Sequence, residues 1–405
     1  MPLRVCLDVT PLLGVRTGVG RYVEALLGAL AGLPAGRGGL ALAGAAFSLR
    51  NRGGLASLPQ GVARRHRPVP ARALQRAWMR ADRPPVEWLA GRCDVFHATN
   101  FVLPPARRAA GVVTVHDLTF LRYPELVTAQ VLRYRELVPR SVARAAQVLC
   151  PSEAVAQEVA AEFGLAPERV RVTPLGVSAD WFAAAAPPPA QRAALGLPER
   201  YVLFVGTREP RKNLGVLLRA HAAARAQDPH VPQLVLAGPA GWGAGPGGAG
   251  AGPGGWGAGP GGAGADLPSP PVCARPAGTA GAHKPEAVPD CLALGYLPSD
   301  ALRAVVAGAE AVALPSVYEG FGLPLLEALA AGTRVLASDL PVHREVAGTH
   351  ARYTDAGDED GWAQALLELA GADRGDPGPG RDWAARWTWA ACAEATAAAY
   401  RDAAA

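Results

Sequence analysis

Short apolar runs alternate with longer amphipathic segments along most of the chain. In the first half, polar or glycine-bearing loops separate these runs from segments whose apolar residues recur every three or four positions. The short runs are typical of buried strands and the longer segments of helices. The expected strands are Leu3 to Thr10, Leu40 to Leu49, Asp94 to His97, Gly111 to His116, Gln147 to Cys150 and Arg169 to Thr173. Strands that alternate with helices predict a parallel α/β sheet.

The same pattern restarts after the proline-rich stretch 187–189, which is typical of a linker. Further strands are expected at Tyr201 to Val205, Gln233 to Ala237, Ala311 to Leu314 and Arg334 to Ala337, and a last helix at Trp389 to Ala403. We therefore expect two α/β domains with parallel sheets, residues 1–185 and 186–385, followed by a terminal helix within 386–405.

Helix ends are marked most clearly in the segment 153–163. Ser152 precedes it, and a serine hydroxyl can cap the first free backbone N–H groups of a helix. Gly164 follows it and can adopt the left-handed conformation that ends many helices. The sequence therefore predicts a helix over this range.

One segment, 241–287, departs from the pattern. The unit GWGAGPGGAGA occurs at 241–251 and again at 255–265, and 14 of the 25 residues from 241 to 265 are glycine. A segment of this composition cannot bury enough apolar area to offset the entropy of ordering it. We expect a mostly disordered loop here.

The charges exclude some classes of partner. The 40 basic and 35 acidic residues give a net charge of +5, and the two signs are interleaved, so no nucleic-acid platform is indicated. The clearest basic patch is Arg64 to Arg67, followed by Arg72, Arg76 and Arg80. This patch is either a solvated face or a contact for anionic lipid headgroups.

The location of the protein is predicted from its cysteines and its apolar runs. None of the six cysteines forms a C-x-x-C pair, which favours a reduced, cytoplasmic protein. Arg4 and Asp8 interrupt the first apolar stretch, so it does not resemble a signal peptide. No run approaches the roughly 18 apolar residues of a membrane span. Any contact with the inner face of the membrane would be peripheral.

The most informative segment runs from Glu319 to Glu327. Two glycines and Pro324 separate these carboxylates, and an apolar helix follows, with Pro324 expected at its first position and Glu327 in its first turn. The free N–H groups at the start of such a helix favour a phosphate or another anion. A diphosphate flanked by hydroxyl-rich groups would suit this arrangement, as in a nucleotide-sugar. The alternative is a strand–loop–helix junction without a ligand.

Three further segments follow expected strands. Arg211 and Lys212 come after the first strand of the second half, and cations beside a helix start can hold a diphosphate. His116 ends a very apolar strand in the first half, where ligands of open parallel sheets bind. Near the N-terminus, Thr17-Gly18-Val19-Gly20 would let a ligand approach the backbone, although Val23 breaks the dinucleotide pattern. No spacing of metal ligands is present, so neither a metal nor another cofactor is expected.

These segments together resemble the retaining, nucleotide-sugar-dependent glycosyltransferases of family 4, of the mannosyltransferase type. The resemblance covers nearly the whole chain except 241–287. It rests on Asp8 with Thr17 to Tyr22, Val115 to Leu118, Tyr123 to Glu125, Val172 to Val177, Gly206 to Asn213, Gly295 to Pro298, Pro315 to Pro324 and Ala337 to Val346. It implies the GT-B fold, in which two Rossmann-like domains face each other and a C-terminal helix crosses back to the first.

The resemblance also implies roles for single residues. Arg211 and Lys212 would hold the donor diphosphate, and Glu327 would bind the ribose hydroxyls. Glu319 would contact the transferred sugar, as would His116 from the other domain. The segment Gly320, Phe321, Gly322 and Leu323 would contact the sugar and phosphates, and Gly18 with its neighbours the phosphates or the acceptor. No metal would be required.

The expected activity is transfer of a hexose, with mannose favoured, from a GDP- or UDP-sugar to a glycan or lipid-linked acceptor with retention. Two alternatives stay open at this point. A sugar-nucleotide 2-epimerase shares the fold but isomerises its substrate, and a non-catalytic homologue would only bind nucleotide or glycan. Ser178 and Thr207 depart from the residues that many family members carry at these positions, and the repeats replace what is usually a short loop near the nucleotide.

Overall fold

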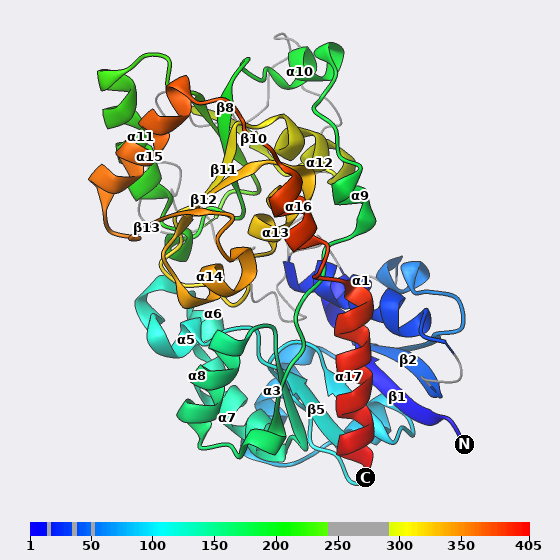
Figure 1. Ribbon diagram of the computed structural model, residues 1–405. Coiled ribbons are helices and arrows are strands. Elements are labelled where there is room, and N and C mark those ends of the chain that lie inside the picture. The colour runs from blue at the N-terminus through cyan, green and yellow to red at the C-terminus, as the bar shows by residue number, and fades with distance from the viewer. Residues whose placement is uncertain (14–17, 35–38, 50–52, 242–290) are drawn as a thin grey trace, which may run out of the picture. The chain divides into compact units, whose positions relative to one another are not determined.

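The computed structural model describes residues 1–13, 18–34, 39–49, 53–241 and 291–405. The segment expected to be a disordered loop, 241–287, lies outside these residues except for Gly241, and so does Thr17. The described residues form two compact units. Unit 1 comprises 1–176 and 387–405, and unit 2 comprises 177–241 and 291–386 (Figure 1).

Unit 1 contains a seven-stranded parallel sheet with the order β3-β2-β1-β4-β5-β6-β7. Its strands are β1 Leu3–Asp8, β2 Leu40–Phe47, β3 Ala63–Arg67, β4 Val95–Ala98, β5 Ala110–Thr114, β6 Gln147–Cys150 and β7 Val170–Val172. Its helices are α1 Gly18–Ala31, α3 Ala71–Arg80, α4 Val86–Ala90, α5 Thr119–Arg122, α6 Ala129–Leu132, α7 Tyr134–Arg144, α8 Glu153–Phe163 and α17 Trp389–Ala404. The strand order reverses its direction of growth between β1 and β4. This is a topological switch point, where ligand crevices form in such sheets.

Unit 2 contains a six-stranded parallel sheet with the order β10-β9-β8-β11-β12-β13. Its strands are β8 Tyr201–Val205, β9 Gln233–Ala237, β10 Cys291–Gly295, β11 Ala311–Leu314, β12 Arg334–Ser338 and β13 Arg352–Thr354. Its helices are α9 Ala179–Phe182, α10 Pro189–Leu195, α11 Leu214–Gln227, α12 Ser299–Gly308, α13 Leu323–Ala331, α14 Pro341–Ala347, α15 Glu359–Gly371 and α16 Gly378–Ala384. The expectation of parallel α/β sheets is confirmed in both units.

The units divide the chain at slightly different residues from the expected limits of 185 and 385. Unit 2 begins at Val177, because the short helix α9 packs against α13 of that unit. The chain returns to unit 1 at Trp387.

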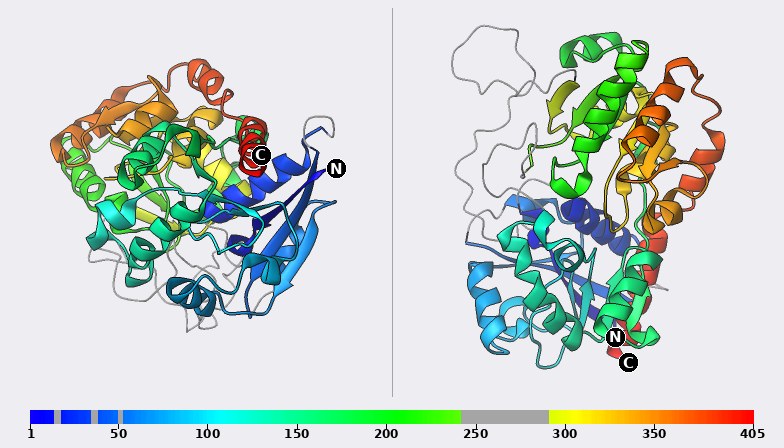
Figure 2. Two further views of the ribbon diagram at one scale, coloured as in Figure 1. Left: turned by 90° about the horizontal axis from the view of Figure 1, so that it is seen from below. Right: turned by 90° about the vertical axis from the view of Figure 1, so that its left-hand side faces the viewer.

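The last helix, α17, packs on unit 1, as expected. It lies beside α1 in both viewing directions (Figures 1 and 2) and also contacts β5 and β6. Its Tyr400 hydroxyl is 2.7 Å from Nδ1 of His97, whose Nε2 is 2.7 Å from the hydroxyl of Thr114. Thr114 is in turn 3.0 Å from the hydroxyl of Tyr22 on α1. This buried chain of hydrogen bonds joins β4 and β5 to both helices.

The basic run Arg64 to Arg67 forms most of β3, an edge strand that the sequence pattern did not predict. Charged edge strands resist pairing with other chains. Arg65 and Arg67 donate to the carbonyl oxygens of Ala90 and Leu89 at the end of α4, so these two side chains have a structural use. Arg76 and Arg80 are exposed on α3.

Candidate functional site

The candidate site of unit 2 lies where two loops meet at the carboxyl edge of its sheet. One loop follows β8 and carries Arg211 and Lys212, and the other follows β11 and carries Glu319. The strands β8 and β11 are hydrogen-bonded neighbours. Parallel neighbours end at the same edge, so the two loops lie together although more than 100 residues separate them in sequence. The backbone N–H of Val317 donates to the carbonyl oxygen of Arg211 at 2.9 Å and ties the loops to each other.

The first loop turns sharply before α11. Residues Pro210–Lys212 form a single 3₁₀ turn, and Asn213 adopts a left-handed conformation with φ of 52°. Asparagine tolerates this conformation better than most residues. Its side-chain Nδ2 donates to the carbonyl oxygen of Ala356 at 2.7 Å, which anchors the turn. This turn leaves Arg211 and Lys212 only 6% exposed each.

Glu319 lies between the two cations. Its Oε1 accepts from Lys212 Nζ at 2.5 Å and from the Ser316 hydroxyl at 2.7 Å, and its Oε2 accepts from Arg211 Nη1 at 2.7 Å. Arg211 Nη2 also donates to Glu209 Oε1 at 2.6 Å. We call Glu209, Arg211, Lys212 and Glu319 the ion cluster. Both cations are therefore bonded to carboxylates.

The pKa values of the two carboxyl groups in the ion cluster are shifted in opposite directions. Burial alone would raise the pKa of Glu319, but the charges of Arg211 and Lys212 outweigh it and hold that pKa well below its usual range. Burial raises the pKa of Glu209, and Arg211 offsets this only in part. Glu319 is thus the carboxylate that stays ionised.

The helix start predicted beside Glu319 is present, with a small shift. Gly322 has φ of 91° and immediately precedes α13, which begins at Leu323. Pro324 is therefore the second helical residue and not the first. The expectation that Glu327 lies in the first turn was wrong, because the left-handed Gly322 fixes the helix start too early for that. Glu327 is instead buried further along α13, at 6% exposure.

A further histidine, His343, to which no role was assigned from the sequence, lies against this helix start. A Cβ at Gly322 would be 3.4 Å from Cδ2 of His343 on α14. The Nδ1 of His343 is 2.8 Å from the carbonyl oxygen of Ser338, so this nitrogen carries the proton. Its Nε2 is buried without a hydrogen-bond partner within the described structure, and burial lowers the pKa of this imidazole.

The candidate residues of unit 1 lie at the carboxyl edge of its own sheet. His116 follows β5, is 8% exposed, and has its Nε2 2.8 Å from the carbonyl oxygen of Thr99. The rings of Tyr22 and Phe101 meet the imidazole edge-on at 5.1 and 5.5 Å. Gly18, Val19 and Gly20 form the first turn of α1.

The protonation state of His116 follows from these contacts. Burial lowers its pKa, which favours the neutral imidazole near pH 7. A carbonyl oxygen can only accept, so Nε2 carries the proton and Nδ1 is the acceptor nitrogen. His116 can therefore accept a hydrogen bond from a hydroxyl through Nδ1.

The part of the chain that the structure describes holds no group of three or more His, Cys, Asp or Glu side chains placed to bind a metal ion. Nor does any of its helices have the length and apolar character needed to cross a membrane.

Family models match both parts of the chain. The model "Glycosyltransferase Family 4" matches residues 16–181, and the model "Glycosyl transferases group 1" matches residues 276–371. Two curated relatives extend these matches. The chain is 27% identical over 314 residues to O-antigen chain mannosyltransferase B of Escherichia coli, which covers 76% of this chain and 74% of the relative.

It is also 31% identical over 339 residues to the D-inositol 3-phosphate glycosyltransferase of Stackebrandtia nassauensis, which covers 78% of this chain and 67% of the relative.

Solved structures show the same fold. Sucrose-phosphate synthase of Thermosynechococcus elongatus matches with a TM-score of 0.63 at 17% identity, over 98% of both chains. Anabaena HepE, solved in complex with UDP and glucose, matches with a TM-score of 0.56 at 16% identity, over 99% of this chain and 95% of that one. Two Rossmann-like units of this kind define the GT-B architecture. The chain belongs to family 4 of the glycosyltransferases.

Proposed function

We propose that this glycosyltransferase moves a hexose from a nucleoside-diphosphate sugar to a glycan or lipid-linked acceptor, with retention and without a metal ion. The ion cluster beside the start of α13 carries this proposal. It combines two buried cations with the N-terminal end of a nine-residue helix, and both features favour a diphosphate.

In this proposal, the cations gain the diphosphate as a further partner when the donor binds. Lys212 has three N–H donors, and Glu319 accepts from it through one oxygen. The diphosphate takes further N–H groups of Lys212 and Arg211, while Glu319 keeps both side chains in place. Two cations at this position would stabilise the charge that develops on the leaving diphosphate, which is the task of a metal ion in other transferases.

Retention requires that the new bond forms on the face from which the diphosphate leaves. The bond between the sugar C1 and the phosphate oxygen breaks, and a bond between C1 and the acceptor oxygen forms. The proton of the acceptor hydroxyl passes to an oxygen of the departing phosphate. In this account, Glu319 and the neutral His116 orient sugar hydroxyls, and Glu327 binds the ribose.

Mannose is the favoured hexose because the Escherichia coli relative is named as a mannosyltransferase. The base is GDP or UDP. HepE binds UDP, but its 16% identity to this chain supports a shared fold and not a shared base.

A peripheral contact with the cytoplasmic face of a membrane fits the exposed Arg76 and Arg80 of α3. This contact would bring a lipid-linked acceptor to the enzyme. Binding to vesicles with and without anionic lipid would test it, and Arg76→Glu should weaken binding only to the anionic ones.

Incubation with a panel of GDP- and UDP-hexoses and mannoside acceptors in EDTA tests the proposal. We expect nucleotide release that depends on the acceptor, and a product whose new linkage keeps the anomeric configuration of the donor by NMR. An inverted linkage would exclude retention, and an isomerised donor without transfer would indicate a 2-epimerase. Donor binding without turnover would indicate a non-catalytic homologue.

A further inference from the structure

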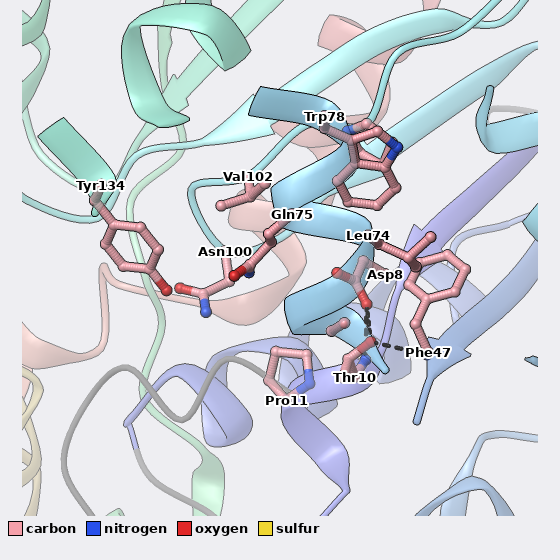
Figure 3. A pocket seen from close by; sticks show the side chains of 12 residues that line it. Asp8, Thr10, Pro11, Phe47, Leu74, Gln75, Trp78, Asn100, Val102 and Tyr134 are labelled. Atoms are coloured by element: carbon pink, nitrogen blue, oxygen red, sulfur yellow. Dashed lines mark hydrogen bonds between the residues drawn. The ribbon is translucent and has the colours of Figure 1, made fainter. Parts of the chain in front are cut away.

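A pocket of unit 1 is lined by residues that have no role in the account above. Its empty volume is about 500 Å³, part of it open to solvent. It is lined from β1, β2 and α3, from the segment after β4 and from the start of α7 (Figure 3). The ends of β1 and β4 flank the topological switch point of the sheet, where ligands of parallel sheets bind.

The polar groups of this pocket are suited to hydroxyls. The side chains of Gln75, Asn100 and Tyr134 point their polar ends toward one another (Figure 3). Asp8 lies nearby, and its Oδ1 accepts from the backbone N–H and the hydroxyl of Thr10 at 2.9 and 2.5 Å. The two carboxamides and the phenol can donate to or accept from a neutral hydroxyl, and the carboxyl group of Asp8 can accept from one.

The remaining lining side chains are apolar and include Trp78, Leu74 and Phe47. Small-molecule sites commonly combine such walls with a few converging polar groups. Within the described chain, none of the side chains that line the pocket is Lys, Arg or His. Among these described lining side chains, a phosphate would meet the carboxyl group of Asp8 and no cation.

A strained backbone holds one of these polar groups. Phe101, next to Asn100, has φ of 62°. A bulky residue rarely adopts this conformation, and the strain costs on the order of 1–3 kcal/mol. The Phe101 N–H donates to the carbonyl oxygen of Thr114 at 3.0 Å. The centre of the Phe101 ring lies 5.0 Å from that of Tyr134 and 5.5 Å from that of His116.

This strained segment connects the pocket to His116. The carbonyl oxygen of Thr99, one residue before Asn100, accepts from His116 Nε2 at 2.8 Å, and the Thr99 hydroxyl donates to the carbonyl oxygen of Asp8 at 2.6 Å. One short segment therefore positions both a pocket amide and the histidine assigned to the donor sugar.

We propose that this pocket binds the acceptor as a neutral, hydroxyl-rich sugar ring, read by Asp8, Gln75, Asn100 and Tyr134, and excludes phosphorylated polyols. This inference rests on the proposed function and adds the chemical class of its acceptor. It separates this chain from relatives named for inositol 3-phosphate.

The test is binding of methyl α-mannoside and of methyl α-mannoside 6-phosphate to the full chain, measured by saturation-transfer NMR. Calorimetry of GDP and UDP binding runs in parallel. We expect the neutral glycoside to bind at least tenfold more tightly than its phosphate. Asp8→Asn and Gln75→Ala should each lower the affinity for the neutral glycoside about three- to tenfold, which is the effect of one lost hydrogen bond. Nucleotide affinity should stay as in the wild type.

Asp8→Asn keeps Oδ1 for Thr10, so it should fold normally. The matched control for Gln75→Ala is Gln157→Ala on the exposed face of α8, which should change neither affinity. Equal binding of the two glycosides, or pocket variants that bind the neutral glycoside like the wild type, would overturn the inference. Loss of nucleotide binding by the wild-type protein would overturn the proposed function instead.

Discussion

Lys212 Nζ lies 2.5 Å from Glu319 Oε1, and each of these side chains is only 7% exposed. The pair joins a loop after β8 to a loop after β11. Glu319 also bonds Arg211, so two buried cations that are assigned to the donor share one carboxylate. The same contact therefore affects both the stability of unit 2 and the charge that a diphosphate would meet.

Glu319→Gln should destabilise the protein strongly. It leaves Arg211 and Lys212 buried without their shared charge, and breaking a buried ion pair costs about 3–5 kcal/mol. Urea unfolding measures the loss. Glu359→Gln is the control, because Glu359 pairs with Arg219 on the surface, where such a pair contributes about 0–1 kcal/mol. Equal losses in the two variants would show that Glu319 is not the central counterion.

Glu209→Gln should lower the free energy of unfolding much less than Glu319→Gln does, by about 1 kcal/mol or less at pH 7. Burial raises the pKa of Glu209, so the native state favours its protonated form, and that stabilisation is lost as pH rises through the native pKa. The neutral amide keeps an oxygen for Arg211 Nη2 and avoids this loss. Unfolding free energies at pH 5 and 7 check this. A loss at pH 7 as large as that of Glu319→Gln would contradict it.

The folded protein should lose stability as pH falls below about 6.5, the usual histidine pKa. Burial lowers the pKa of His97 to about 3, so the unfolded chain binds a proton there that the native chain excludes. This histidine contributes about 1.4 kcal/mol per pH unit to the slope of the unfolding free energy against pH.

His97→Gln should reduce the pH slope of the unfolding free energy between pH 6.5 and 5, measured by urea titration. His230→Gln, at an exposed position, is the control and should leave the slope unchanged. An equal slope in the wild type and in His97→Gln would contradict the claim that only the unfolded chain binds a proton at His97 in this pH range.

Gly322→Ala should destabilise unit 2 by about 1–2 kcal/mol, because a side chain at a left-handed position is strained. The added Cβ would also lie 3.1 Å from Leu325 Cδ1 and 3.4 Å from His343. Gly28→Ala in α1 has no atom within 4 Å of the new Cβ and should stabilise by about 0.5–1 kcal/mol. Thermal unfolding of the two variants should therefore shift in opposite directions.

The buried strands were predicted most accurately. Gln147–Cys150, Tyr201–Val205, Gln233–Ala237 and Ala311–Leu314 have the expected limits, because strands covered on both faces are continuous apolar runs. The helix Glu153–Phe163 also agrees, with the Ser152 hydroxyl accepting from Val155 and Gly164 left-handed at its end.

Several elements were missed, and one of them lacks an apolar signal. The edge strand β3 has the sequence Ala-Arg-Arg-His-Arg, whose charges suit an exposed edge and conceal its strand character. The short strand β13 and the helix α12 were also left unassigned.

The candidate site was predicted in part. Arg211, Lys212 and Glu319 each follow a buried strand, so the sequence places all three at the carboxyl edge of a sheet. It cannot show that Glu319 pairs with both cations, because that depends on β8 and β11 being neighbours. Glu209 was missed, although a carboxylate two residues before Arg211 was a usable signal. The pocket residues of unit 1 come from five separate segments, and no local pattern joins them.

The most direct test of the account is calorimetric titration of GDP and UDP into the protein in the presence of EDTA. We expect one nucleoside diphosphate to bind without metal, and Lys212→Ala to weaken it at least tenfold while the fold is retained. Glu327→Gln should also weaken binding, and Glu359→Gln should not. Binding that disappears in EDTA and returns with Mn²⁺, or a Lys212→Ala protein with wild-type affinity, would contradict the claim that the ion cluster holds the donor diphosphate.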